Sequence, residues 1–168
     1  KLMKIFVSLF LFLSIFLNAQ IHWKSPKYGY SIEIPKKFKR TTDIVGKNVD
    51  FKVEYGRSSV VIVVKTLSRD MAQYSIWDIL GDLDSYTQEW EYGASEYFDN
   101  PKVIKYGKTT INGLQTFWLD YTTSDGLYSK NYSVKKGNRI YTITLSNPKQ
   151  LNSNYSSIWY RFKNSIRL

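Results

Sequence analysis

Three tight-turn signals constrain the second half of this chain more than any other feature of its sequence. Asn112-Gly113, Asp125-Gly126 and Gly137-Asn138 each stand between runs that are rich in apolar residues. Asn-Gly and Asp-Gly favour tight hairpin turns because both central residues tolerate a positive φ. The runs between the turns alternate in polarity, as strands with one buried face do. Four consecutive strands in an antiparallel meander are therefore predicted over residues 102–146.

The first half of the chain adds short strands and one helix. Strands are predicted over residues 28–34, 50–55 and 60–64, and the last is a continuous β-branched run, which favours burial on both faces. Ser75, followed by Asp78, resembles a capping box at the start of a helix. The apolar residues of that helix recur at helical spacing and are Ile76, Ile79, Leu80, Leu83, Tyr86 and Trp90.

A second helix is predicted near the end of the sequence. Arg161, Lys163 and Arg167 mark its solvent side. Its apolar stripe consists of Tyr155, Ile158, Trp159, Phe162 and Ile166. The order of strands, helix, meander and helix predicts a single α+β domain, in which an antiparallel sheet of about six or seven strands is sandwiched between helices.

The beginning of the sequence has the character of an export signal. Lys1 and Lys4 precede an apolar run over residues 5–17, and Ala19 follows it. A short basic start, a short apolar stretch and a small residue at its end are typical of a cleavable secretory signal peptide. We expect a signal peptide over residues 1–19, with an uncleaved membrane anchor as the alternative. The domain over residues 20–168 is then expected in the periplasm or outside the cell.

Composition excludes several kinds of chemistry. The sequence contains no Cys and one His, which excludes disulfides, a thiol nucleophile and a site with several His ligands. The single imidazole, His22, stands close to the expected cleavage point and has no G-x-S-x-G motif to support a catalytic role. We therefore expect no catalytic residues, no metal site and no cofactor.

The charge of the chain is unevenly distributed along the sequence. The formal net charge is +10, yet residues 70–99 contain no Lys or Arg. The acidic residues of that segment are Asp70, Asp78, Asp82, Asp84, Glu89, Glu91, Glu96 and Asp99. An acidic outer helix face is predicted, serving either solvation or the docking of a partner. This acidic segment and the expected export argue against nucleic acid as the partner of a chain with a pI of about 9.6.

Two groups of residues are candidates for binding. The basic cluster Lys36, Lys37, Lys39 and Arg40 follows Pro35 directly and suits an anionic lipid or glycan surface, with a solvated loop as the alternative.

The second group is aromatic. Trp118, Tyr128 and Tyr132 are predicted on one sheet face together with Lys130, a composition that is typical of recognition surfaces. The alternative is that the closing helices cover these rings as part of the core.

The segment YGYSIEIP over residues 28–35 resembles the opening strand of PsbP-like domains, which tend to begin with an aromatic-rich strand ending in Pro. A central helix, an Asn-Gly hairpin, a strand over residues 116–121 and a closing helix follow in the same order. Phe38 stands where a Trp is often found. The resemblance spans about residues 28–168 and implies the fold shared by extrinsic photosystem proteins and Ran-binding proteins of the Mog type. It implies a binding role rather than catalysis, and it carries over no site residues.

The sequence thus predicts an exported, non-enzymatic accessory protein of the cell envelope that contacts an envelope or secreted protein. Two other classes stay open. One is a surface-associating module that binds anionic lipid or glycan through the basic cluster. The other is a small hydrolase, which requires a cluster of polar residues that converge in a cleft.

Overall fold

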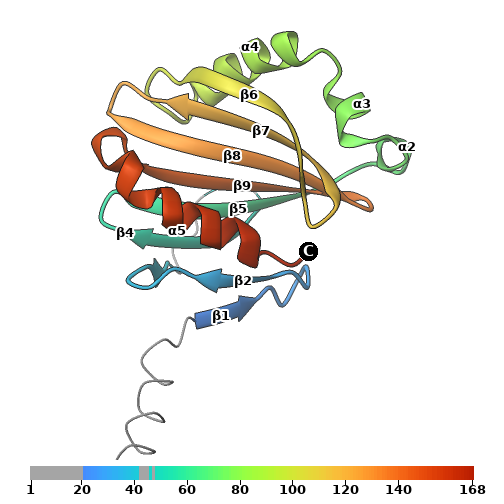
Figure 1. Cartoon of the computed structure of the whole chain (residues 1–168). Coiled ribbons are helices and arrows are strands. Elements are labelled where there is room, and N and C mark those ends of the chain that lie inside the picture. The colour runs from blue at the N-terminus through green and yellow to red at the C-terminus, as the bar shows by residue number, and fades with distance from the viewer. Residues whose placement is uncertain (1–20, 42–45, 47) are drawn as a thin grey trace, which may run out of the picture.

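The predicted meander forms one half of a seven-stranded antiparallel sheet with the strand order β3-β4-β5-β9-β8-β7-β6 (Figure 1). The computed structural model describes residues 21–41, 46 and 48–168, so the expected signal peptide over residues 1–19 lies outside the described residues. The sheet consists of β3 (Lys39–Arg40), β4 (Val49–Tyr55), β5 (Ser58–Thr66), β6 (Lys102–Ile111), β7 (Leu114–Thr122), β8 (Leu127–Lys136) and β9 (Arg139–Pro148). This architecture confirms the predicted α+β class.

The turns of the meander use the conformations that their residues favour. Asn112 and Gly113 both have positive φ angles, of 52° and 77°, as a two-residue hairpin loop with a type I′ turn requires. Gly137 has a φ of 58° between β8 and β9, where Lys136 pairs with Arg139. All three predicted turns therefore join neighbouring antiparallel strands.

One face of the sheet carries the main core. It is covered by the C-terminal helix α5 (Asn152–Ser165), which follows the short helix η1 (Lys149–Leu151), and by a separate hairpin of β1 (Ile21–Lys24) and β2 (Ser31–Ile34). Val60, Ile62 and Val64 of β5 are almost fully buried under this layer. Their neighbours Val61 and Val63 point to the opposite face and are only half-buried, so the expectation that residues 60–64 are buried on both faces was wrong.

Val61 and Val63 are only half-buried because the helices on their face of the sheet cover its other half. Helices α3 (Ile76–Leu80) and α4 (Leu83–Ala94) contact β7 and β6 rather than β5. There they bury Phe117, Leu119 and Tyr121. A helix on each side thus makes the predicted sandwich, although the two helical layers are offset along the sheet (Figure 1).

The long acidic helix predicted over residues 76–90 is divided. Gly81 has a φ of 67° and ends α3, and Asp82 then caps α4 by accepting a hydrogen bond from the Ser85 amide. A short helix α2 (Arg69–Ala72) precedes both. The predicted capping box at Ser75 and Asp78 is present. Among the described residues, no helix is long and apolar enough to cross a bilayer.

Helix α5 is anchored at its middle and just beyond its C-terminal end. The indole N–H of Trp159 donates to the side-chain oxygen of Asn147 at 2.8 Å, and both residues are buried. Beyond the helix, Arg167 and Ser31 exchange two backbone hydrogen bonds of 2.8 and 2.9 Å, which tie the end of the chain to β2. These contacts fix the distance between α5 and the β1–β2 hairpin.

Replacing Trp159 with Phe leaves the Asn147 oxygen buried without its donor. We expect the free energy of unfolding in urea to fall by about 1–3 kcal/mol beyond the loss of packing. Trp77→Phe is the matched control, because the buried Trp77 indole N–H has no acceptor among the described residues. Equal losses for the two variants would contradict the structural role of the Trp159–Asn147 hydrogen bond.

Candidate functional site

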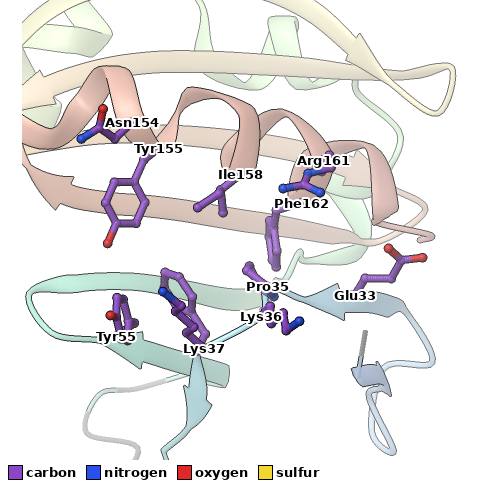
Figure 2. Close-up of a pocket in the computed structure, with 11 residues that line it drawn as sticks. Glu33, Pro35, Lys36, Lys37, Tyr55, Asn154, Tyr155, Ile158, Arg161 and Phe162 are labelled. Carbon is purple, nitrogen blue, oxygen red and sulfur yellow. The ribbon is translucent and has the colours of Figure 1, made fainter. Parts of the chain in front are cut away.

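A groove of about 570 Å³ lies between helix α5 and the turn that follows β2 (Figure 2). Its volume falls within the range of ligand pockets, roughly 300–1,000 Å³. The residues that line it come from β2, the turn after it, the end of β4 and α5, and are Glu33, Pro35, Lys36, Lys37, Phe38, Tyr55, Asn154, Tyr155, Ile158, Arg161 and Phe162.

The groove has an apolar floor between aromatic walls. Phe38 and Phe162 are buried beneath it, and Phe38 packs edge-on against Trp159 with ring centroids 5.9 Å apart. Tyr155 points from α5 toward β4, where Tyr55 forms the opposite wall (Figure 2). A floor of this kind accepts apolar or aromatic groups and excludes water from beneath them.

The rim of the groove is cationic. Lys36, Lys37 and Arg161 line it, and Glu33 is the one carboxylate among the lining residues that the structure describes. Within the described residues, neither Lys36 nor Arg161 has a carboxylate within ion-pair distance. Their positive charges are therefore directed to solvent or to a ligand, and they favour an anionic one.

A strained turn places Lys37 at this rim. The Phe38 amide donates to the Pro35 carbonyl at 3.0 Å, which closes a turn in which Lys37 has a φ of 81°. A positive φ at this turn position favours Gly or Asn, and a side chain there costs about 1–2 kcal/mol. The Lys37 ammonium lies 5.8 Å from the centre of the Tyr55 ring, so the strained residue contacts the aromatic wall.

The structure divides the predicted basic cluster. Lys36 and Lys37 line the groove, whereas Lys39 and Arg40 form β3 at the edge of the sheet and do not line it. The Arg40 guanidinium lies 5.0 Å from the ring of Trp23, on a different part of the surface.

The predicted aromatic group does share one sheet face. Trp118 pairs with Tyr132, and Tyr128 and Lys130 follow on the same face of β8. All three rings are half-buried, and Lys163 of α5 lies 5.8 Å from the ring of Tyr132. The rings are thus neither fully covered by helix nor fully open to solvent.

A buried carboxylate organises this face. Asp120 is 1% exposed and accepts hydrogen bonds from the Tyr128 hydroxyl at 2.5 Å and the Lys130 ammonium at 2.8 Å. Burial raises the pKa of the Tyr128 hydroxyl, and the Asp120 carboxylate raises it further. Burial also raises the pKa of Tyr132 to about 12. Because these groups satisfy one another, the network stabilises the sheet and offers little free hydrogen-bonding capacity to a ligand.

The Trp118 ring packs against Gly107 of β6, which has no side chain in the space that the ring occupies. A Cβ atom at Gly107 would lie 3.2–3.3 Å from the Trp118 ring, closer than the packing permits without movement. The indole therefore lies across β6, where it covers a glycine that weakens the edge strand.

The other chemically relevant residues are dispersed. His22 lies in β1, opposite Glu33, and is exposed. Within residues 21–41 and 48–168, no three His, Cys, Asp or Glu side chains gather as a metal site would require.

The fold has known counterparts. It is a PsbP-like fold, and the solution structure of cyanobacterial PsbP (CyanoP) from Synechocystis sp. PCC 6803 matches it with a TM-score of 0.71 over 89% of this chain and 92% of that one, at 13% sequence identity. LpqN from Mycobacterium tuberculosis, described as involved in cell envelope biogenesis, matches with a TM-score of 0.57 at 6% identity, over 88% of this chain and 89% of that one. A Pseudomonas aeruginosa protein described as a putative regulator matches at 0.51 and 12% identity, over 90% and 98%.

These likenesses confirm the predicted PsbP-like fold, and at such low identities they extend to the fold alone. No protein-family model matches the sequence. No curated protein sequence matches it either. The residues of the groove therefore have to be interpreted from their own chemistry.

Sequence reasoning missed half of the groove. Tyr155 and Ile158 were assigned to the apolar stripe of the closing helix and Arg161 to its solvent side, and both descriptions hold. The available sequence signal was Arg161, which stands directly beside the apolar stripe of the helix. A cation at that position marks the boundary between the face that packs on the sheet and the face that is open to a ligand. Nothing in the sequence places that boundary opposite Lys36 and Lys37.

Lys37→Gly should stabilise the protein, because glycine relieves the strained turn. We expect the free energy of unfolding to rise by about 0.5–1 kcal/mol, which is the relief of strain less the greater freedom that glycine gives the unfolded chain. Lys36→Gly is the matched control, since Lys36 does not have a positive φ, and it should lose stability slightly. A Lys37→Gly variant less stable than the parent would show that the turn is not strained.

Proposed function

We propose that this chain is an exported, non-enzymatic accessory protein of the cell envelope, and that its basic groove binds an acidic segment of a partner protein. The observation that carries this proposal is the combination of three cationic side chains on the rim with an apolar, aromatic floor. The floor contributes affinity through buried apolar surface, and the rim selects for negative charge.

The shape of the site favours a protein segment over a flat surface. Lys36, Lys37 and Arg161 surround a hollow, and Lys39 and Arg40 lie apart from it. A bilayer or polysaccharide surface is contacted best by charges that share one plane, whereas a projecting side chain with acidic neighbours fills a groove. Arg161 also suits a carboxylate ligand, because its planar guanidinium can donate two parallel hydrogen bonds.

Export and an accessory role rest on further support. The first nineteen residues fit the three-part signal pattern. LpqN, which has a similar fold, is described as involved in cell envelope biogenesis. A binding role is supported by the position of His22, the one imidazole of the sequence, which is exposed on β1 and is not among the residues that line the groove.

The test compares two variants with the same loss of charge. Lys36→Gln/Lys37→Gln removes two cations from the groove, and Lys65→Gln/Arg69→Gln removes two exposed cations outside it. Tagged chains are cross-linked in the native cells, captured, and analysed by mass spectrometry at low and moderate salt. We expect one dominant envelope protein with the parent and the control, and about tenfold weaker binding of that protein by the groove variant.

The other outcomes oppose the proposal. A partner that both variants retain equally would place binding on another surface, such as the aromatic face around Trp118. Binding of purified parent chain to anionic but not zwitterionic vesicles, without a captured protein, would support the surface-associating module in its place.

A further inference from the structure

We propose that an acidic stripe, formed by Glu89 and Tyr92 of helix α4 and by Glu96 in the turn that follows it, docks into the basic groove of a second copy of this chain. The inference rests on the proposed function, because it takes the groove to be a site for acidic segments. It goes beyond that function by naming a segment of this same protein as an occupant, so that self-association competes with capture of the partner.

The acidic stripe has the form of an unpartnered docking element. Its three residues are spaced at i, i+3 and i+7, and the helical turn continues past α4 through a hydrogen bond from the Phe98 amide to the Ala94 carbonyl at 2.9 Å. Residues at this spacing share one helix face and extend over about 10 Å. The Tyr92 side chain is 83% exposed, and Tyr97 in the turn after α4 is 79% exposed.

The negative charges of the stripe are not neutralised within the described part of the chain. Glu91 contacts Lys102 at 3.3 Å and accepts a hydrogen bond from the Val103 amide, so it serves the attachment of α4 to β6. Glu89 and Glu96 are exposed and form no ion pair there. Residues 70–99 contain no Lys or Arg, so the only cations near the stripe come from other segments, such as Lys102 of β6, which pairs with Glu91.

The chemistry of the stripe complements that of the groove. A tyrosine ring flanked by two carboxylates meets an apolar floor with aromatic walls and a rim of three cations. The Tyr92 ring would occupy the space between Tyr55 and Tyr155, and the two glutamates would approach the rim cations. Opposite surface charges of this kind steer association and fix its orientation.

The fold requires this contact to be intermolecular. Helix α4 contacts β6, at one edge of the sheet, whereas the groove includes the end of β4 and the turn leading to β3, at the other edge. Figure 1 shows α4 and the β2–β4 region on opposite sides of the molecule. Each copy therefore carries the acidic stripe and the basic groove on different sides. A contact between the stripe of one copy and the groove of the next is head-to-tail, and such contacts lead to open chains or closed rings.

The test is sedimentation velocity of the purified domain over a range of concentrations at low and at high salt. Wild type should associate with rising concentration at low salt and be monomeric at high salt, because exposed charges are screened. Lys36→Glu/Lys37→Glu should block the groove, and Glu89→Gln/Glu96→Gln should remove the charge of the stripe without making it complementary to the altered groove, so each variant alone should be monomeric. An equimolar mixture of the two should form 1:1 dimers and nothing larger, since one intact interface remains.

Aromatic substitutions supply a second readout without a change of charge. Tyr92→Ala should weaken association at least fivefold, whereas Tyr74→Ala, which removes a 48% exposed tyrosine outside the stripe, should leave it unchanged. Association that persists in the groove variant, or a mixture that grows beyond dimers, would overturn the head-to-tail contact.

Failure of this inference is distinguishable from failure of the proposed function. A wild type that stays monomeric, yet captures an envelope protein in a manner that depends on Lys36 and Lys37, refutes the self-association alone. Loss of both the self-association and the groove-dependent capture refutes the two together.

Discussion

The attachment of helix α5 to one face of the sheet is the contact on which the rest of the structure depends. The helix follows β9 through the short helix η1, and the Trp159–Asn147 hydrogen bond fixes the middle of the helix within the core. Its far end is held by the backbone pair of Ser31 and Arg167, which also secures the β1–β2 hairpin. Over the described residues that hairpin forms a two-stranded sheet of its own, so its position is set by packing against α5 and the face of the main sheet.

The groove is a consequence of this attachment. Helix α5 and the β2 region lie on the same face of the sheet, and the groove lies between the helix and the turn after β2. The turn uses a strained conformation to place Lys37 at the rim, although glycine would satisfy the backbone there at lower cost. A lysine in a strained conformation at the edge of a cationic groove destabilises the fold, and a role in binding explains its presence there.

Local patterns in the sequence predicted the meander, the closing helix and the α+β class, because turn residues and apolar periodicity act over a few neighbouring positions. The break at Gly81 was missed, since a single glycine within a helical pattern is compatible with continuation until its positive φ is seen. Val61 and Val63 are half-exposed because the second helical layer covers the other end of the sheet, an offset that no local pattern encodes. The groove joins residues 36 and 37 to residues 155–161, and only the tertiary arrangement brings them together.

Backbone amide chemical shifts can locate the binding surface, which we propose to be the groove. The probe is a synthetic peptide with one tyrosine between glutamates, titrated into the ¹⁵N-labelled domain with a lysine-substituted peptide as control. If the groove binds acidic segments, the acidic peptide alone should shift the amides of residues 36–38, Tyr55 and residues 154–162, and salt should reverse the effect. Shifts centred on Trp118 and Tyr132, or none at saturating peptide, would contradict the proposal.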